Sequence, residues 1–242
     1  MQKLAAEAVG TFGLVFAGTG AVVVDAETGG GVGHVGIGLT FGLIIMVMIY
    51  AVGHVSGAHF NPAVTLAFAV GRHFPWPLVP RYWAAQLLGG VLASLTLRGL
   101  FGEVAHLGAT LPAGAAGRSF VLELVLTFLL MFVITAVATD VRAVGQAAAI
   151  AIGGTIGLEA LFAGPISGAS MNPARSLAPA LVSWTWDHQW LYVAGPALGA
   201  VVRVLVYQVV RGEPRGNDLD RSRPSAGVPF PHPGRPRPQH RP

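Results

Sequence analysis

One segment of fifteen residues occurs twice in this chain. Residues 53–67, GHVSGAHFNPAVTLA, align with residues 164–178, GPISGASMNPARSLA, at a constant offset of 111, and nine of the fifteen positions are identical. A second, shorter similarity links an early apolar run to a later one. The same three residue types occur at the same spacing in both runs: Glu7, Thr11 and Phe12, and Glu123, Thr127 and Phe128. Chance does not produce such agreement, so the chain consists of two related halves.

The apolar content of the chain is incompatible with an ordinary soluble surface. Hydrophobic residues make up 53% of the sequence and charged residues only 11%, with a mean hydropathy of +0.61, so the surrounding solvent must be lipid. A helix needs about 20 mostly apolar residues to cross a bilayer. Six stretches qualify: 4–24, 35–52, 82–101, 120–139, 146–163 and 190–210. We predict an all-α membrane protein with six transmembrane helices.

Each half of the chain contains three of these stretches, with repeat one at about residues 3–101 and repeat two at about 118–211. An odd number of crossings makes the second copy enter the membrane from the opposite face. We therefore predict an inverted 3+3 repeat, in which the two Asn-Pro-Ala segments approach the bilayer from opposite sides.

Each Asn-Pro-Ala segment is predicted to start a re-entrant half-helix, because the apolar residues 61–71 and 172–182 are too few to span. Asparagine is a favoured N-cap, and proline suits the first helical position, where no backbone donor is needed. Irregular backbone at this depth survives only when it is buried in protein or lines a wet cavity. The sequence thus predicts a water-filled path.

Basic residues near the apolar stretches indicate the orientation of the chain, because Lys and Arg are enriched in cytoplasmic loops. Lys3, Arg72, Arg81, Arg142 and Arg211 fall on one side, and Arg98 and Arg118 fall on the other. Both termini are therefore predicted to be cytoplasmic. Residues 212–242 are rich in Pro and Arg, and we expect a disordered tail. The net charge of +4 fits a basic tail beside an anionic membrane better than nucleic-acid binding.

The paired Asn-Pro-Ala motifs at repeat spacing resemble the major intrinsic protein family, the aquaporins and glycerol channels. The resemblance covers about residues 3–211, and FAGPISGASMNPARSLAPA is most similar to the nodulin-26-like branch, which includes channels for glycerol or metalloid hydroxides. It implies a right-handed bundle of aquaporin type in a channel domain at 1–211, and a homotetramer with one pore per subunit.

The resemblance also implies how ions are excluded from the pore. Two helix N-termini that meet place about half a positive charge each at the centre, and asparagine side chains offer donors to a passing water. The motif residues are Asn61, Pro62, Ala63, Asn172, Pro173 and Ala174. Backbone carbonyls that replace hydration partners are expected near Gly57, Ala58, His59, Gly168, Ala169 and Ser170.

Arg175 stands at the third position of the second half-helix, where the helix dipole disfavours a cation. In the family the matching arginine forms the narrowest filter with three other positions, which fall here on Phe41, Ala160 and Ala169. Water-selective members usually carry histidine at the Ala160 position. The resemblance thus implies a wider filter that passes glycerol, urea or neutral metalloid acids. Typical glycerol channels, however, carry aspartate where this chain has Ser176, so a strictly water-selective channel remains an alternative.

Several residues allow a functional or a structural interpretation. Glu7 and Glu123 are intramembrane carboxylates that could relay protons, although the family pattern implies that each accepts backbone N–H groups from a re-entrant loop. His54 and His59 could gate the pore or serve as structural imidazoles. Two further residues depart from the family pattern, Glu159 near the filter and Arg203 in the last span.

Other classes of function are less compatible with the sequence. A secondary transporter with inverted repeats would need a coupling-ion site, and a non-conducting scaffold would not need intact motifs. We expect no enzyme, cofactor or metal site, because no nucleophile with a base, ligand cluster or phosphate loop is present. The zero cysteines exclude disulfides. Abundant Ala, Gly, Val and Arg with little Lys suggest a bacterial inner membrane.

Overall fold

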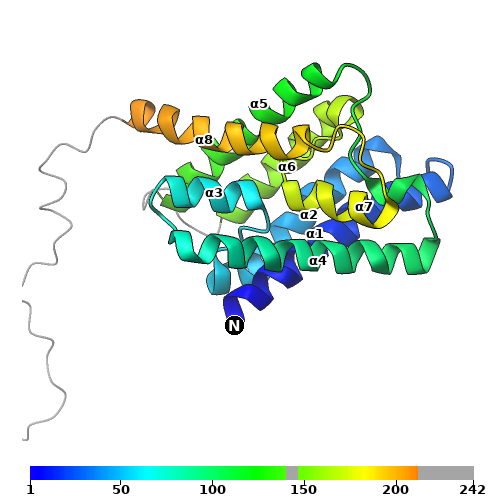
Figure 1. The fold of residues 1–242 in the computed structure, drawn as a ribbon, viewed down its shortest axis with the longest axis horizontal. Coiled ribbons are helices and arrows are strands. Elements are labelled where there is room, and N and C mark those ends of the chain that lie inside the picture. The colour runs from blue at the N-terminus through cyan, green and yellow to red at the C-terminus, as the bar shows by residue number, and fades with distance from the viewer. Residues whose placement is uncertain (140–146, 212–242) are drawn as a thin grey trace, which may run out of the picture. The chain divides into compact units, whose positions relative to one another are not determined.

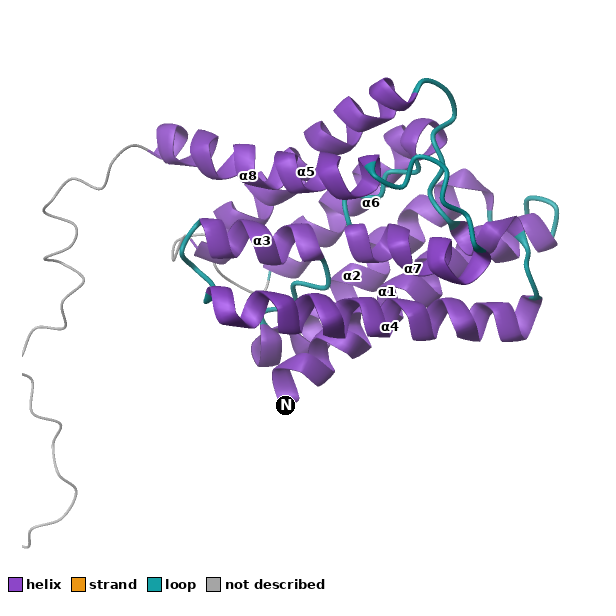
Figure 2. Cartoon of the chain, viewed as in Figure 1, coloured by secondary structure: helices purple, strands orange, loops and turns teal. Residues whose placement is uncertain are grey.

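The computed structural model describes residues 1–139 and 147–211, and residues Met1–Tyr207 pack as one unit. Within the described ranges the chain is helical and has no strand (Figures 1 and 2). The long helices are α1 Gln2–Glu27, α2 Gly33–Ser56, α4 Val79–Phe101, α5 Ala116–Thr139, α6 Ala148–Ser167 and α8 Leu191–Arg211. Arg142 and the expected tail at 212–242 lie outside the described residues.

The long helices correspond to the six predicted spans, each shifted at its ends by a few residues. Five of them, α1, α2, α4, α5 and α6, are long and apolar enough to cross a membrane. The sixth, α8, has 21 residues and begins at the predicted place. The all-α membrane fold expected from the apolar stretches is therefore confirmed.

Two short helices occupy the predicted half-helix positions: α3 at Pro62–Val70 and α7 at Pro173–Ser183, with nine and eleven residues. At about 1.5 Å of rise per residue neither can cross a bilayer. Asn61 and Asn172 are the N-caps, both in extended backbone, and each accepts hydrogen bonds from the first turn through its own side-chain oxygen. Local N-capping chemistry thus places both helix starts where the sequence predicts them.

Glycines let the long helices approach closely. A Cβ at Gly42 of α2 would lie 2.6 Å from the carbonyl oxygen of Gly153 in α6. In the same way Gly89 of α4 faces the backbone of Ala8 in α1, and Gly199 of α8 faces that of Leu124 in α5. The last two contacts are equivalent in the two halves. Each joins the first long helix of its half, α1 or α5, to the third, α4 or α8. Small residues at helix crossings are typical of packing in membranes, where lipid removes the usual hydrophobic drive.

The segment between α4 and α5, residues 102–115, folds back onto the helices. Its 3-10 turn η2 at Ala105–Gly108 contacts α1, α4 and α7. His106 and Leu107 take left-handed backbone conformations, with φ of 48° and 55°, which non-glycine residues rarely adopt. Leu107 is nevertheless fully buried against Leu97 and Val182, so this connection is anchored by its own side chain and lies next to α7.

Candidate functional site

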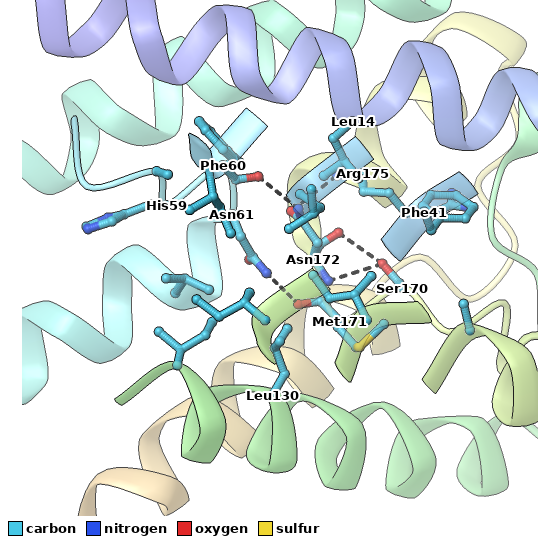
Figure 3. Close-up of a pocket in the computed structure, with 18 of the residues that line it drawn as sticks. Leu14, Phe41, His59, Phe60, Asn61, Leu130, Ser170, Met171, Asn172 and Arg175 are labelled. Carbon is cyan, nitrogen blue, oxygen red and sulfur yellow. Dashed lines mark hydrogen bonds between the residues drawn. The ribbon is translucent and has the colours of Figure 1, made fainter. Parts of the chain in front are cut away.

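The two half-helices meet at their N-terminal ends through reciprocal hydrogen bonds of the motif asparagines. Nδ2 of Asn61 donates to the carbonyl oxygen of Met171 at 2.8 Å, and Nδ2 of Asn172 donates to that of Phe60 at 2.9 Å (Figure 3). Each side-chain oxygen meanwhile caps its own helix. An amide nitrogen carries two hydrogens, so each asparagine keeps one donor beyond this cross-link. The two loops are therefore joined directly to each other at the junction.

The loops that precede the half-helices share an unusual backbone. Ala58 and Phe60 in the first loop and Ala169 and Met171 in the second all have φ between 41° and 55°. Such left-handed conformations in non-glycine residues cost roughly 1 kcal/mol or more each. They recur at equivalent positions of both repeats, so the strained backbone is a shared structural feature of the two loops.

Buried carboxylates hold these loops in place. Glu7 accepts hydrogen bonds from the backbone N–H groups of His59 and Phe60 at 3.0 and 2.8 Å. Glu123 accepts those of Ser170 and Met171 at 2.8 and 2.7 Å. Both side chains are 0% exposed, and their acceptor sites are filled by loop donors together with Ser56, Gln86 and Ser167. This arrangement gives the carboxylates a structural task and fits proton relay poorly.

A cavity of mixed polarity lies beside the junction. The two loops and the starts of the half-helices supply its polar groups, and side chains of α1, α2, α5 and α6 supply much of its apolar lining (Figure 3). Among the residues expected to offer carbonyl acceptors, Gly57, Ala58, His59, Ala169 and Ser170 line the cavity, whereas Gly168 is not in its lining. Both Asn61 and Asn172 line it. The lining therefore combines hydrogen-bonding groups with apolar side chains.

The four expected filter residues, Phe41, Ala160, Ala169 and Arg175, all line this cavity. The guanidinium carbon of Arg175 lies 4.8 Å from the centre of the Phe41 ring, a distance suited to cation–π attraction. Its Nη1 donates to the carbonyl oxygen of Gly108 at 2.8 Å, and its Nε has no hydrogen-bond partner among the described residues. The other two positions are alanines, Ala160 and Ala169, which carry only a methyl group. They are 7% and 6% exposed.

The two histidines occupy different surroundings. His59 lines the cavity, with Nδ1 3.1 Å from Oγ1 of Thr65, and its ring contacts those of Phe68, Phe74 and Tyr82. Such a packed, hydrogen-bonded ring favours the structural interpretation. His54 lies exposed on α2 and is not part of the cavity wall.

The two residues that depart from the family pattern are both buried. Glu159 is 1% exposed and does not line the cavity, so its carboxylate is not open at the mouth of the passage; neither oxygen has a hydrogen-bond partner in the described parts of the chain. Arg203 is 3% exposed within α8. Within residues 1–139 and 147–211 no group of His, Asp and Glu side chains could hold a metal ion.

Half-helices that meet inside a bundle of long apolar helices, beside a cavity lined by both polar and apolar groups, define a multi-pass membrane channel. Residues 1–207 match the family Major intrinsic protein. The chain belongs to the major intrinsic protein family, a family of channels rather than enzymes, and the predicted passive channel for water and small uncharged solutes is confirmed.

Relatives and a solved structure agree with this assignment. The chain is 54% identical over 212 residues to Aquaporin NIP1-1 of Oryza sativa subsp. japonica, covering 87% of this chain and 75% of that one. It is 55% identical over 212 residues, with the same coverage, to Putative aquaporin NIP4-1 of Arabidopsis thaliana. The fold resembles the aquaglyceroporin from Plasmodium falciparum with a TM-score of 0.77 and 27% identity, covering 91% and 99% of the two chains. The predicted likeness to the nodulin-26-like branch is confirmed.

Three site contacts were not predicted from the sequence. The cross-links from the asparagines to the opposite loops and the bond from Arg175 to Gly108 join residues 110, 112 and 67 positions apart. The inverted repeat could have suggested the first pair, because it brings the two motifs together. Nothing in the residues around Gly108 marks it as a partner of the arginine.

Proposed function

We propose that Phe41, Ala160, Ala169 and Arg175 form the selectivity filter of a channel that passes water, glycerol and similar small uncharged solutes such as urea or metalloid acids. The observation that carries the proposal is that two alanines line the same cavity as the aromatic ring and the guanidinium, which lie 4.8 Å apart. Two methyl groups leave more room, and offer fewer polar partners, than a histidine at position 160 would. An amphipathic solute such as glycerol fits a filter that combines apolar side chains with the hydrogen-bond donors of a guanidinium.

Ion exclusion follows from the junction of the half-helices in this proposal. The N-termini of α3 and α7 each carry about half a positive charge, and the remaining N–H donors of Asn61 and Asn172 address the oxygen of a water. A water held in this way cannot readily accept a proton from its neighbour. A cation would also lose hydration that a partly apolar lining cannot replace, and unpaired charges are costly to bury. Neutral solutes avoid both penalties.

Ala160→His is expected to lower glycerol permeability about tenfold or more and to leave water permeability within about threefold, because a single badly fitting group in a tight site costs 1–3 kcal/mol. Stopped-flow light scattering of proteoliposomes, with osmotic and glycerol gradients applied to the same preparation, measures both. The water flux of the variant is the internal control for folding and insertion. Absence of glycerol flux in the parent protein would refute the wide filter.

A strictly water-selective channel is the second candidate, favoured by Ser176 at the position after the filter arginine. The same experiment separates the two candidates, since this alternative predicts water flux without glycerol flux in the parent protein. Saturable or ion-coupled uptake in these vesicles would instead point to a transporter.

We further propose a homotetramer of channel domains at residues 1–211 with both termini in the cytoplasm and residues 212–242 as a tail. Apolar side chains remain exposed at helical spacing on α2 (Leu39, Leu43, Val47) and on α5 (Val121, Val125, Leu129), and neighbouring subunits or lipid would cover them. Native mass spectrometry is expected to give four copies of the 25.0 kDa chain; a monomeric mass in mild detergent would contradict this. The relatives come from plants, so a bacterial inner membrane has no support.

A further inference from the structure

Each half-helix carries a hydroxyl at its fourth position, Thr65 in α3 and Ser176 in α7, and the two are related by the repeat offset of 111. Each hydroxyl contacts the residue two places before its asparagine. In the first repeat this contact joins Thr65 to the His59 ring, and in the second it joins Ser176 to the hydroxyl of Ser170. Both halves therefore contain a contact between the half-helix hydroxyl and the loop before the asparagine. They differ in how this contact is connected to the rest of the fold.

The anchors differ between the repeats. Thr65 accepts a hydrogen bond from Nε2 of Gln86 at 3.0 Å, and Gln86 also donates to Glu7 at 2.8 Å. The first half-helix is thus tied to a transmembrane helix, α4. Ser176 instead accepts a hydrogen bond at 2.9 Å from Oγ1 of Thr110, which is 1% exposed and lies in the segment 102–115 between α4 and α5. The second half-helix is tied to a connection between helices.

The same segment holds the filter arginine. Gly108, two residues before Thr110, offers the carbonyl oxygen that accepts from Nη1 of Arg175 at 2.8 Å. The backbone of Gly108 is left-handed, with φ of 72°, and packs so closely on Thr19 of α1 that a Cβ there would lie 2.7 Å from its Cβ. Gln189 fixes the other side, donating to the carbonyl oxygen of Thr110 at 3.0 Å. Residues 108–110 therefore have little freedom while the Thr110 contacts hold.

We propose that Thr110 and Ser176 are positioning residues that latch the segment 102–115 onto the second half-helix and so keep the Arg175 guanidinium against the wall of the filter. Nη1 of Arg175 depends on a carbonyl of that segment, and its Nε has no hydrogen-bond partner among the residues described. Without the Thr110 hydroxyl the segment keeps its other anchors but loses its side-chain tie to Ser176, and the Gly108 carbonyl can shift relative to the second half-helix. The guanidinium then leans into the passage, where water can hydrate it, and obstructs a larger solute more than water. The inference rests on the proposed filter role of Arg175.

The test compares Thr110→Val, which keeps the shape of the side chain but removes the hydroxyl, with Thr110→Ser, which keeps the hydroxyl. Thr110→Val is expected to lower water permeability per channel about threefold and glycerol permeability about tenfold, the range associated with one hydrogen bond. Thr110→Ser is expected to stay near the parent. Thr96→Val is the matched control, since Thr96 is exposed and its hydroxyl bonds only its own helix, at Leu92.

A double-mutant cycle separates positioning from general destabilisation. If the latch acts through the arginine, Thr110→Val has no further effect on water permeability in an Arg175→Ala background. An effect that persists there, or equal permeabilities of Thr110→Val and the parent, would overturn the proposal. Ser176→Ala removes the acceptor and serves as the second variant if Thr110→Val does not yield folded protein. Water flux without glycerol flux in the parent would sink the wide filter alone, because the cycle is read on water.

Discussion

Replacing Glu123 by leucine is expected to abolish water permeability and to lower the thermal stability of the protein severely. The carboxylate accepts hydrogen bonds from the Ser167 hydroxyl and from the backbone N–H groups of Ser170 and Met171. Each donor left without an acceptor in a buried site costs about 1–3 kcal/mol. Three together approach the whole stability of a typical domain, about 5–15 kcal/mol. Released from the carboxylate, the left-handed loop would also lose the conformation that positions Asn172.

Thermal unfolding of the purified protein and stopped-flow water permeability measure this loss. Glu123→Gln tests the relay hypothesis separately, because a carboxamide keeps an acceptor oxygen but carries no titratable proton; water flux that survives this change argues for the supporting role. Glu103→Gln is the matched control, since its carboxylate is half exposed and pairs with Arg98 at 3.2 Å, and exposed pairs contribute little. Parent-like stability of the leucine variant would contradict the assignment.

The parts of the fold that could be predicted are those with local chemical signals. Apolar runs of about 20 residues predicted the long helices, because a helix satisfies all its backbone hydrogen bonds within one segment and needs about this length to cross a bilayer. Asn followed by Pro predicted the starts of α3 and α7, because capping is decided within one turn. The repeat, finally, predicted that Glu7 and Glu123 do the same task, and both are found beneath equivalent loops.

The contacts that escaped prediction are long-range and use backbone atoms. Any residue supplies a carbonyl oxygen, so the sequence cannot mark Gly108, Phe60 or Met171 as acceptors. His106 and Leu107 likewise take left-handed backbone conformations although neither is glycine, the residue type that would predict such a conformation. In the sequence, Ser176 is only a departure from the aspartate of typical glycerol channels. In the structure its hydroxyl accepts a hydrogen bond from Thr110. Asymmetry between the repeats thus arises where one half-helix is tied to a connecting segment.

Replacing Arg175 by valine is expected to raise the leak of protons and small cations through the channel about 10- to 100-fold, while water permeability stays within about twofold. A cation in the filter would pass roughly 5 Å from the guanidinium, where repulsion at an effective dielectric constant of about 20 is about 3 kcal/mol, or about 100-fold. The other positions of the proposed filter are Phe41, Ala160 and Ala169, none of which carries a charge. The arginine is therefore the only fixed cation of the proposed filter, and the helix N-termini at the junction would form the remaining barrier.

The leak is measured with a pH-sensitive dye and a potassium-diffusion potential in proteoliposomes, normalised to water flux in the same vesicles. Arg175→Lys separates charge from geometry, because an ammonium keeps the positive charge but lacks the planar fork that reaches Gly108 and faces the Phe41 ring. This variant should remain tight to cations and yet change the ratio of glycerol to water permeability. An unchanged leak in Arg175→Val would mean that the half-helix dipoles and dehydration alone exclude cations, and that the arginine acts only on neutral solutes.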